Sequence, residues 1–139
     1  MRHLYIFLAV FSILYLLACT SEASTSRPLN PNGDSELALL MRAMFEDGMK
    51  VKAQIQHGEK PTISVDFMKI YEAKPTDPVK MKPAEFKVLA QSYLQAVQAL
   101  QAAAPGQVKG LYKGMVITCI NCHNTICPGP KAKIKQLYL

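Results

Sequence analysis

The chain has 139 residues, a formal net charge of +6, four cysteines and no tryptophan. A chain of this length has room for one small domain and not for two. Its modest basic excess forms no stripe interleaved with aromatic residues, which argues against nucleic-acid binding.

The first residues have the pattern of a secretory leader. A short basic start over residues 1–3 precedes an apolar run over residues 4–17 that only Ser12 interrupts. That run is too short to span a bilayer comfortably and has the length of a signal-peptide core. We therefore expect residues 1–18 to be a signal peptide that takes no part in the fold.

Residues 16–19 read Leu-Leu-Ala-Cys and resemble the lipobox of bacterial lipoproteins. The resemblance implies cleavage before Cys19 and a diacylglycerol anchor on its thiol, so that several acyl chains would hold the protein on a membrane. A protein anchored in this way faces the oxidising periplasm. Thr20 stands where some bacteria use aspartate to retain a lipoprotein in the inner membrane, which is a slight argument for the outer membrane.

Residues 19–34 consist of this cysteine and a segment that is rich in Ser, Thr, Pro, Asn and Gly and has no periodicity. This composition predicts a flexible stalk. Helical periodicity dominates the rest of the chain. The first predicted helix begins at an Asp34 or Ser35 cap and ends near Gly58. A shorter helix is predicted over about residues 64–74, where a proline-rich crossover stops it.

Two longer helices complete the predicted domain of residues 35–139. Pro83 suits the first turn of a third helix, whose apolar seam continues to Ala104. The fourth helix begins near Pro105 and ends before the Pro128-Gly129-Pro130 turn. Short connections and the lack of an alternating strand pattern predict an all-α fold, specifically an antiparallel four-helix bundle.

The predicted fourth helix carries a row of glycines at its start and two cysteines on its apolar seam. Gly106, Gly110 and Gly114 recur at every fourth position, although glycine inside a helix costs up to about 1 kcal/mol relative to alanine. We therefore expect a neighbouring helix or the edge of a prosthetic group to approach this stripe closely. Further along, Cys119 and Cys122 fall on the apolar seam of the helix and are expected to face the core.

These two cysteines belong to the sequence Cys-Ile-Asn-Cys-His at residues 119–123, the C-x-x-C-H signature of c-type haem attachment. Two thiols three residues apart share one helix face, so they can add to the two vinyl groups on one edge of a porphyrin. His123 then points its imidazole at the iron as the proximal ligand. We expect one covalent haem c, attached through Cys119 and Cys122, near the C-terminal end of the last helix.

The same side chains could in principle form a disulfide, a zinc site or a thioredoxin-like redox pair. A disulfide within C-x-x-C has poor geometry on a regular helix. A zinc site would take Cys119, Cys122 and Cys127 with a histidine, but Cys122 and His123 are adjacent and cannot easily both bind one ion from a helix. A thioredoxin-like redox pair needs a βαβ neighbourhood, which the sequence does not predict.

A four-helix domain with C-x-x-C-H on its last helix resembles the cytochrome c prime family, including its low-spin members with a methionine ligand. The resemblance covers roughly residues 35–127, and C-x-x-C-H is its one specific motif. It implies a haem between the first and last helices, electron transfer or small-gas binding in the periplasm, and pairing into homodimers. The family commonly has a basic residue four positions after the haem histidine, where this chain has Cys127. One helical turn beyond His123, Cys127 is expected to pack on the same face.

The group opposite His123 decides between two functions, because a ligated iron mainly exchanges electrons and an open one binds NO or CO. In an up-down-up-down bundle the haem end of the fourth helix faces the start of the first helix. Met41 and Met44 lie there on the apolar seam, where methionine is most often core filler. We predict Met44 as the distal ligand with Met41 in reserve. His57 lies about 20 Å further along the helix and is a poor candidate.

The C-terminal tail alternates Lys131, Lys133 and Lys135 with apolar residues. Its positive charge would suit an acidic redox partner protein, although an ordinary solvated terminus or contact with lipid headgroups is equally consistent with the pattern. No general acid, base or nucleophile constellation is visible, which argues against an enzyme. The sequence thus predicts a membrane-anchored mono-haem electron carrier. Its alternatives are a gas-binding haem protein and a haem-free lipoprotein with a zinc or thiol site.

Overall fold

The computed structural model describes residues 33–79, 81 and 83–139, and every regular element among them is helical. The predicted signal peptide, Cys19 and most of the predicted stalk lie outside these residues. The α-helices are α2 (Glu36–Gln56), α3 (Pro83–Gln101), α4 (Val108–Thr125) and α5 (Lys131–Ile134), and the 3-10 segments are η1 (Phe67–Tyr71), η2 (Pro105–Gln107) and η3 (Lys135–Leu137). The all-α prediction is confirmed for this part of the chain, which contains four α-helices and no strand. None of the helices described is long and apolar enough to cross a bilayer.

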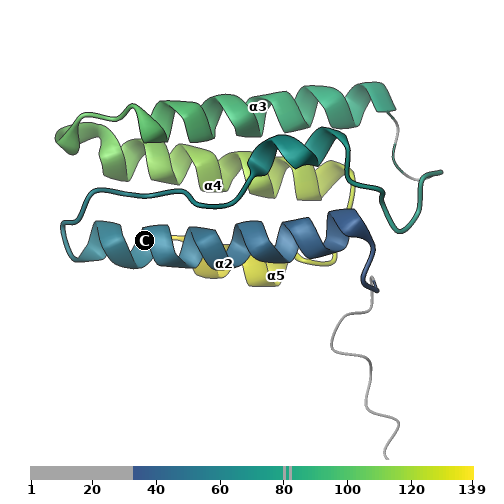
Figure 1. Cartoon of the computed structure of the whole chain (residues 1–139), viewed down its shortest axis with the longest axis horizontal. Helices are drawn as coiled ribbons and strands as arrows, with labels where there is room; N and C mark the ends of the chain where they lie inside the picture. Colours follow the sequence, from purple (N-terminus) through teal and green to yellow (C-terminus); the bar gives the residue numbers. More distant parts are fainter. Residues whose placement is uncertain (1–32, 80, 82) are drawn as a thin grey trace, which may run out of the picture. The chain divides into compact units, whose positions relative to one another are not determined.

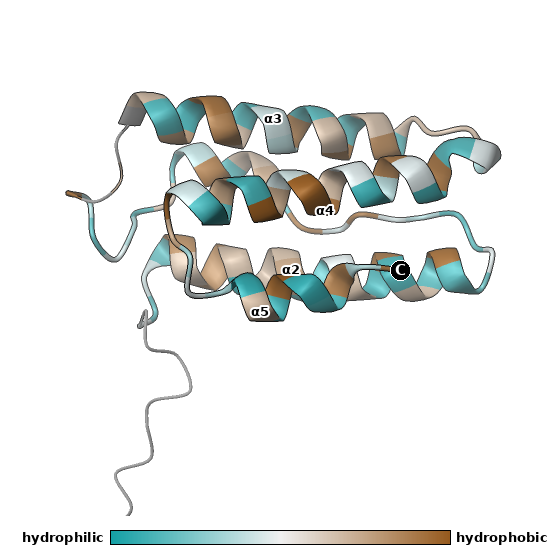
Figure 2. Ribbon diagram, turned by 180° about the vertical axis from the view of Figure 1, so that it is seen from behind, coloured by the Kyte–Doolittle hydropathy of each residue, from teal (hydrophilic) through white to brown (hydrophobic). Residues whose placement is uncertain are grey.

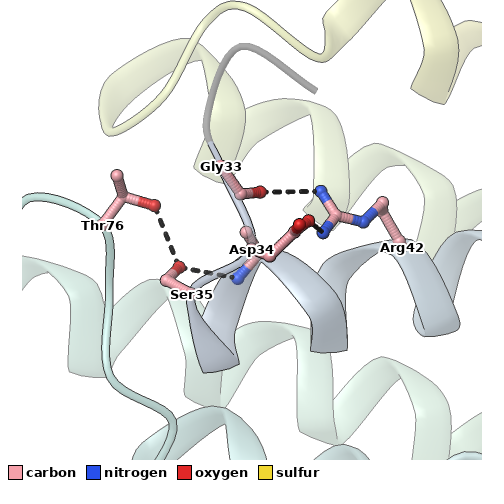
Figure 3. A network of polar contacts seen from close by, with 6 residues as sticks. Gly33, Asp34, Ser35, Arg42 and Thr76 are labelled. Atoms are coloured by element: carbon pink, nitrogen blue, oxygen red, sulfur yellow. Dashed lines mark hydrogen bonds and ion pairs between the residues drawn. The ribbon is translucent and has the colours of Figure 1, made fainter. Parts of the chain in front are cut away.

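Polar side chains define the start of α2, as Figure 3 shows. The Ser35 hydroxyl accepts a hydrogen bond from the Ala38 amide at 3.2 Å, as an N-cap residue does. The same hydroxyl lies 2.9 Å from that of Thr76, in the crossover before α3. Arg42, two turns into the helix, reaches back to the Asp34 carboxylate at 2.5 Å. The predicted cap of the first helix is therefore confirmed, and it also ties α2 to the crossover.

The segment after α2 differs from the prediction, because the helix expected over residues 64–74 is only the five-residue η1. The first helix ends as predicted, at Gly58 with a φ of +75°. The chain then runs on without regular structure to Ser64, where buried Asp47 of α2 accepts hydrogen bonds from the amide, at 3.2 Å, and from the hydroxyl. The β-branched residues that flank Ser64 also favour extended backbone over helix. Ser64, which was expected to begin the helix, is therefore held by α2 in a non-helical segment.

The helices α3 and α4 form the most extensive pair in the described part of the chain and run side by side in opposite directions (Figure 1). Pro83 begins α3, as predicted, and η2 leads into α4. The first residues of α2 lie on the side where α4 ends (Figure 1). Buried apolar residues recur at helical spacing on both members of the pair: Ala90, Tyr93, Leu94, Val97 and Leu100 on α3, and Tyr112, Met115 and Val116 on α4.

The C-terminal tail is folded against α2, so the alternative of an ordinary solvated terminus does not hold. Ile134 and Leu137 are 7% and 4% exposed and belong to the core, while Lys135 between them is exposed. The Tyr112 hydroxyl donates to the carbonyls of Leu137 at 2.9 Å and Gly48 at 3.1 Å. The Lys52 ammonium donates to two tail carbonyls at 2.8 and 2.5 Å. Figure 2 shows the resulting position of α5 beside α2.

The glycine stripe of η2 and α4 does not mark a close approach within the described residues. A Cβ at Gly106, Gly110 or Gly114 would meet no atom within 4 Å. Close packing occurs instead at Gly48 of α2, where a Cβ would lie 3.1 Å from the side chain of Leu137. Among the described glycines, the close approach is therefore made by the tail to α2 and not along α4.

Candidate functional site

The last two turns of α4 carry the C-x-x-C-H motif, and the core-facing position expected for Cys119 is found. Cys119 packs against the buried cluster beside Tyr93 and Tyr112. Burial raises the pKa of the Cys119 thiol to about 12, and the neighbouring Cys122 adds to this. At neutral pH this thiol is therefore protonated, which makes it a poor metal ligand or nucleophile as it stands.

Cys122 is half-buried one turn further on and lies close to Cys127. Burial raises the pKa of the Cys122 thiol, and the proximity of Cys127 raises it further. All three cysteines of the described residues are free thiols. No cluster of three or more His, Cys, Asp or Glu side chains in this part of the chain is arranged to hold a metal ion, so a zinc site has no ligand set there.

His123 is held in a defined orientation by the residue one turn after it. Its Nδ1 lies 2.8 Å from the backbone carbonyl of Cys127. A carbonyl can only accept, so Nδ1 carries the proton and donates, and Nε2 of the neutral ring keeps its lone pair. Burial lowers the pKa of His123, partly offset by this hydrogen bond, and so favours the neutral ring. Histidines that bind metals are oriented in this way by a carbonyl on the second nitrogen.

Cys127, four residues after the histidine, orients His123 through its main chain, and the family resemblance did not predict this role. A basic side chain is expected there from the family resemblance, and Cys127 stands in its place. Its main-chain carbonyl, freed because α4 ends at Thr125, accepts the imidazole hydrogen bond. No side-chain pattern identifies such a contact.

Both predicted methionines lie on α2 and pack against the core, partly buried. Met44 lines a small cavity of about 10 Å³ together with Tyr93 of α3 and Met115 of α4. Cys119, the first cysteine of the motif, packs against the same core cluster as Met44. Met41 does not line this cavity. His57 is exposed at the far end of α2.

Two residues of this region were not singled out from the sequence. Asp47 is 5% exposed and is the buried carboxylate that holds Ser64. Tyr93 is 7% exposed, and its pKa is raised by burial, then by Cys119 and Asp47. One signal was available for Asp47, since an acidic residue on the apolar seam of a helix must find hydrogen-bond donors when it is buried. Tyr93 gave none, because its amphipathic ring is ordinary on such a seam.

The donor set fits a covalently attached haem, whereas two cavities found in the described residues lie away from it. Two thiols share one face of α4, and the adjacent imidazole presents Nε2. A cavity of about 730 Å³ lies between α3 and the segment from Ile70 to Met81, but none of the three motif side chains lines it. A second cavity, of about 10 Å³ and lined in part by Met44, Tyr93 and Met115, is not lined by the motif side chains either.

No protein-family model, no curated protein and no solved structure matches this chain.

Proposed function

We propose that this protein is a mono-haem c-type cytochrome that transfers electrons. The observation that carries the proposal is the hydrogen bond from His123 Nδ1 to the Cys127 carbonyl at 2.8 Å. It prepares the imidazole as a metal ligand directly after two thiols that lie on one helix face. A histidine that served only as a polar surface residue would not need this orientation.

The residues of α4 have distinct tasks in this proposal. Cys119 and Cys122 would hold the haem through thioether bonds, each formed by addition of the S–H across a vinyl group with the hydrogen going to the neighbouring vinyl carbon. His123 would ligate its iron through Nε2. When bound, the haem iron alternates between its ferric and ferrous states and carries one electron. Because Cys119 faces the core, its attachment must precede the final closure of the fold around α4.

The distal side of the iron is assigned to α2. We place Met44 there, with Met41 in reserve, because Met44 packs against the same core cluster as Cys119 and lines a cavity together with Met115 of α4. A histidine and a thioether together give a low-spin iron of raised potential that is suited to electron transfer. In this arrangement the long helices form an antiparallel bundle, with the haem at the C-terminal end of α4.

The proposed setting is the periplasmic face of a membrane, preferentially the outer membrane. Residues 1–18 are removed as a signal peptide, and Cys19 carries the lipid that holds the protein through the stalk over residues 19–34. The partner is an acidic redox protein attracted by the basic surface, and the protein pairs into homodimers as the resemblance implies. Nucleic acid has no place in this function.

Haem staining after denaturing electrophoresis tests the proposal directly. The full chain is produced in a host that matures c-type cytochromes, and the wild type is expected to stain and to have a mass increased by one haem. The Cys119→Ser and Cys122→Ser variants should lose most of the stain, whereas Cys127→Ser, which keeps the backbone carbonyl, should retain it. A colourless wild type with all three of these thiols open to alkylation overturns the proposal.

An absorption spectrum of the same material tests the distal assignment. Methionine ligation predicts a low-spin spectrum with a sulfur-to-iron charge-transfer band in the oxidised form, and this band should vanish in Met44→Ala and persist in Met41→Ala. Rapid binding of CO by the wild type would instead mean an open sixth position and a gas-binding protein. Loss of the band in Met41→Ala alone would transfer the role to the reserve ligand.

A further inference from the structure

The turn that follows α4 begins with Pro128, and this residue explains why the helix ends where it does. A proline disfavours helical backbone in the residue before it, which here is Cys127. Accordingly, α4 ends at Thr125, and Ile126 is its C-cap. Cys127 and Pro128 belong to no regular element. Proline also has no amide hydrogen, so it cannot continue the hydrogen bonds of the helix. The chain therefore leaves the helix at the residue whose carbonyl contacts His123.

This departure from the helix frees the Cys127 carbonyl for another partner. In a continued helix the carbonyl would point along the axis, away from His123, and accept from the amide four residues later, that of Lys131. In the structure the Lys131 amide donates instead to the carbonyl of Pro128, at 3.3 Å. The Cys127 carbonyl lies 2.8 Å from His123 Nδ1 and accepts its hydrogen. The break at Pro128 thus exchanges a main-chain hydrogen bond for one to the imidazole.

The far side of the turn is fixed as well. The carbonyl of Pro130 accepts hydrogen bonds from the amides of Lys133 and Ile134, at 2.9 and 3.0 Å, where α5 begins. Ile134 is 7% exposed and belongs to the buried core. The turn over residues 128–130 is therefore held between α4 and a docked α5. A carbonyl at the start of such a turn has little freedom to rotate away from His123.

We propose that Pro128 is a positioning residue for His123, because it turns the Cys127 carbonyl toward Nδ1, fixes the ring proton there and leaves Nε2 free to bind a metal. The hydrogen bond that a neutral imidazole makes decides which nitrogen carries the proton, and a carbonyl can only accept. This inference rests on the proposed function, in which Nε2 ligates iron. The same hydrogen bond makes the opposite nitrogen a stronger ligand. A stronger ligand stabilises ferric iron more than ferrous iron, so Pro128 lowers the reduction potential.

Nitrogen NMR of the isotope-labelled, haem-free full chain tests the position of the proton, because a ring nitrogen changes its shift when it carries a hydrogen. At a pH where the ring is neutral, wild-type His123 is expected to have its proton on Nδ1. In Pro128→Ala the ratio of the Nδ1–H form to the Nε2–H form should fall about three- to tenfold, the factor that one hydrogen bond gives. Pro130→Ala alters the same turn beyond the acceptor and should leave the ratio unchanged. Cys127→Ala keeps the carbonyl and should also leave it unchanged.

The haem-loaded full chain gives a second readout. Pro128→Ala should raise the midpoint potential, so that the reduced fraction increases in a fixed redox buffer, because the ligand nitrogen loses the support of the hydrogen bond. Pro130→Ala should leave the potential unchanged. A purely structural role of the turn would not produce this difference between the two prolines.

The outcomes separate this inference from the proposed function. A wild type with the His123 proton on Nε2 overturns the inference, as does a Pro128→Ala variant with an unchanged tautomer ratio or potential. Equal changes in both proline variants, or a Pro128→Ala chain that does not fold, also overturn it, because Pro128 would then serve the fold as a whole. If the wild type acquires no haem, the proposed function fails, whereas the NMR result still decides whether Pro128 positions the ring.

Discussion

The hydroxyl of Tyr112 joins three segments of the chain at one point in the core. It extends from α4 to the carbonyls of Gly48 on α2 and Leu137 in the tail, at 3.1 and 2.9 Å. We predict that Tyr112→Phe lowers the free energy of unfolding by about 1–3 kcal/mol, because two buried carbonyls lose a donor. Urea denaturation followed by circular dichroism measures this loss. A variant within 0.5 kcal/mol of the wild type, about the size of an ordinary surface effect, would contradict it.

The same residue predicts how stability depends on alkaline pH. Burial, with a lesser contribution from Cys119, raises the pKa of Tyr112 above its ordinary value near 10. Above that value the unfolded chain releases the phenol proton while the folded chain keeps it, so stability falls as pH rises through 10 and beyond. We expect the free energy of unfolding of Tyr112→Phe to decline less steeply than that of the wild type between about pH 9 and 11. Parallel slopes in the two proteins would contradict the assignment.

For single residues, the sequence predicted which side chains form the candidate site better than it predicted the groups that contact them. Cys119 faces the core as the apolar seam of α4 indicates, because two cysteines three residues apart must share a helix face. The acceptor for His123 is a main-chain carbonyl, and the identity of a side chain carries no information about its carbonyl. Tyr93 of α3 and Asp47 of α2 line the same small cavity, and a periodicity within one helix cannot reveal that they do.

Among the elements, the C-terminal tail contributes more to the fold than its composition suggests. Leu137 is 4% exposed and packs over Gly48, while Leu139, two residues later, is 51% exposed. We predict that Leu137→Ala lowers the free energy of unfolding by about 2–4 kcal/mol through lost burial and the cavity left behind. The matched control Leu139→Ala should change it by less than about 0.5 kcal/mol. Equal effects of the two substitutions, measured by chemical denaturation, would mean that the tail is not docked.

The outward glycines of α4 give a prediction of the opposite sign. Gly110 and Gly114 lie inside a helix, and a Cβ at either position would meet no atom within 4 Å. Gly110→Ala should therefore stabilise the protein by about 0.5–1 kcal/mol, because alanine favours the helix and restricts the unfolded chain. Gly48→Ala should gain less, since its Cβ would press on Leu137. A destabilised Gly110→Ala in thermal denaturation would show that a partner, such as a second copy of the chain, covers this face.

The helices were predictable where local signals decide the structure. Ser35 caps α2, Gly58 ends it, and Pro83 opens α3, each for a reason that lies within a few residues of the boundary. The expected helix over residues 64–74 failed because Asp47, seventeen positions earlier in the chain, binds Ser64. The docking of the tail was not predictable for the same reason, since its partners are on α2 and α4. Long-range hydrogen bonds thus decided the elements whose local signals were weak.

At the scale of the whole molecule, the basic balance predicts how the proposed carrier exchanges electrons. The formal charge is +6, including Arg2 of the predicted leader, and lysines follow α4 directly in α5. We expect the reduced haem-loaded protein to be oxidised by ferricyanide, an anion, at a rate that falls as salt increases, because screening sets in over about 10 Å at 0.1 M ionic strength. Stopped-flow absorbance measures this rate. A cationic cobalt complex should show the reverse dependence.

The position of the charge can be separated from its total. Lys131 begins α5 just after the turn that follows the motif, whereas Lys109 lies in the first turn of α4, about 21 Å from His123 along the helix at 1.5 Å per residue. Lys131→Glu and Lys109→Glu change the net charge equally. If the positive field near the motif guides an acidic partner, Lys131→Glu should slow the ferricyanide reaction more than Lys109→Glu at low salt, and the two should converge at high salt as screening removes the difference. Identical rates at low salt would mean that only the net charge acts, and the acidic partner would then have no preferred approach to the α5 side.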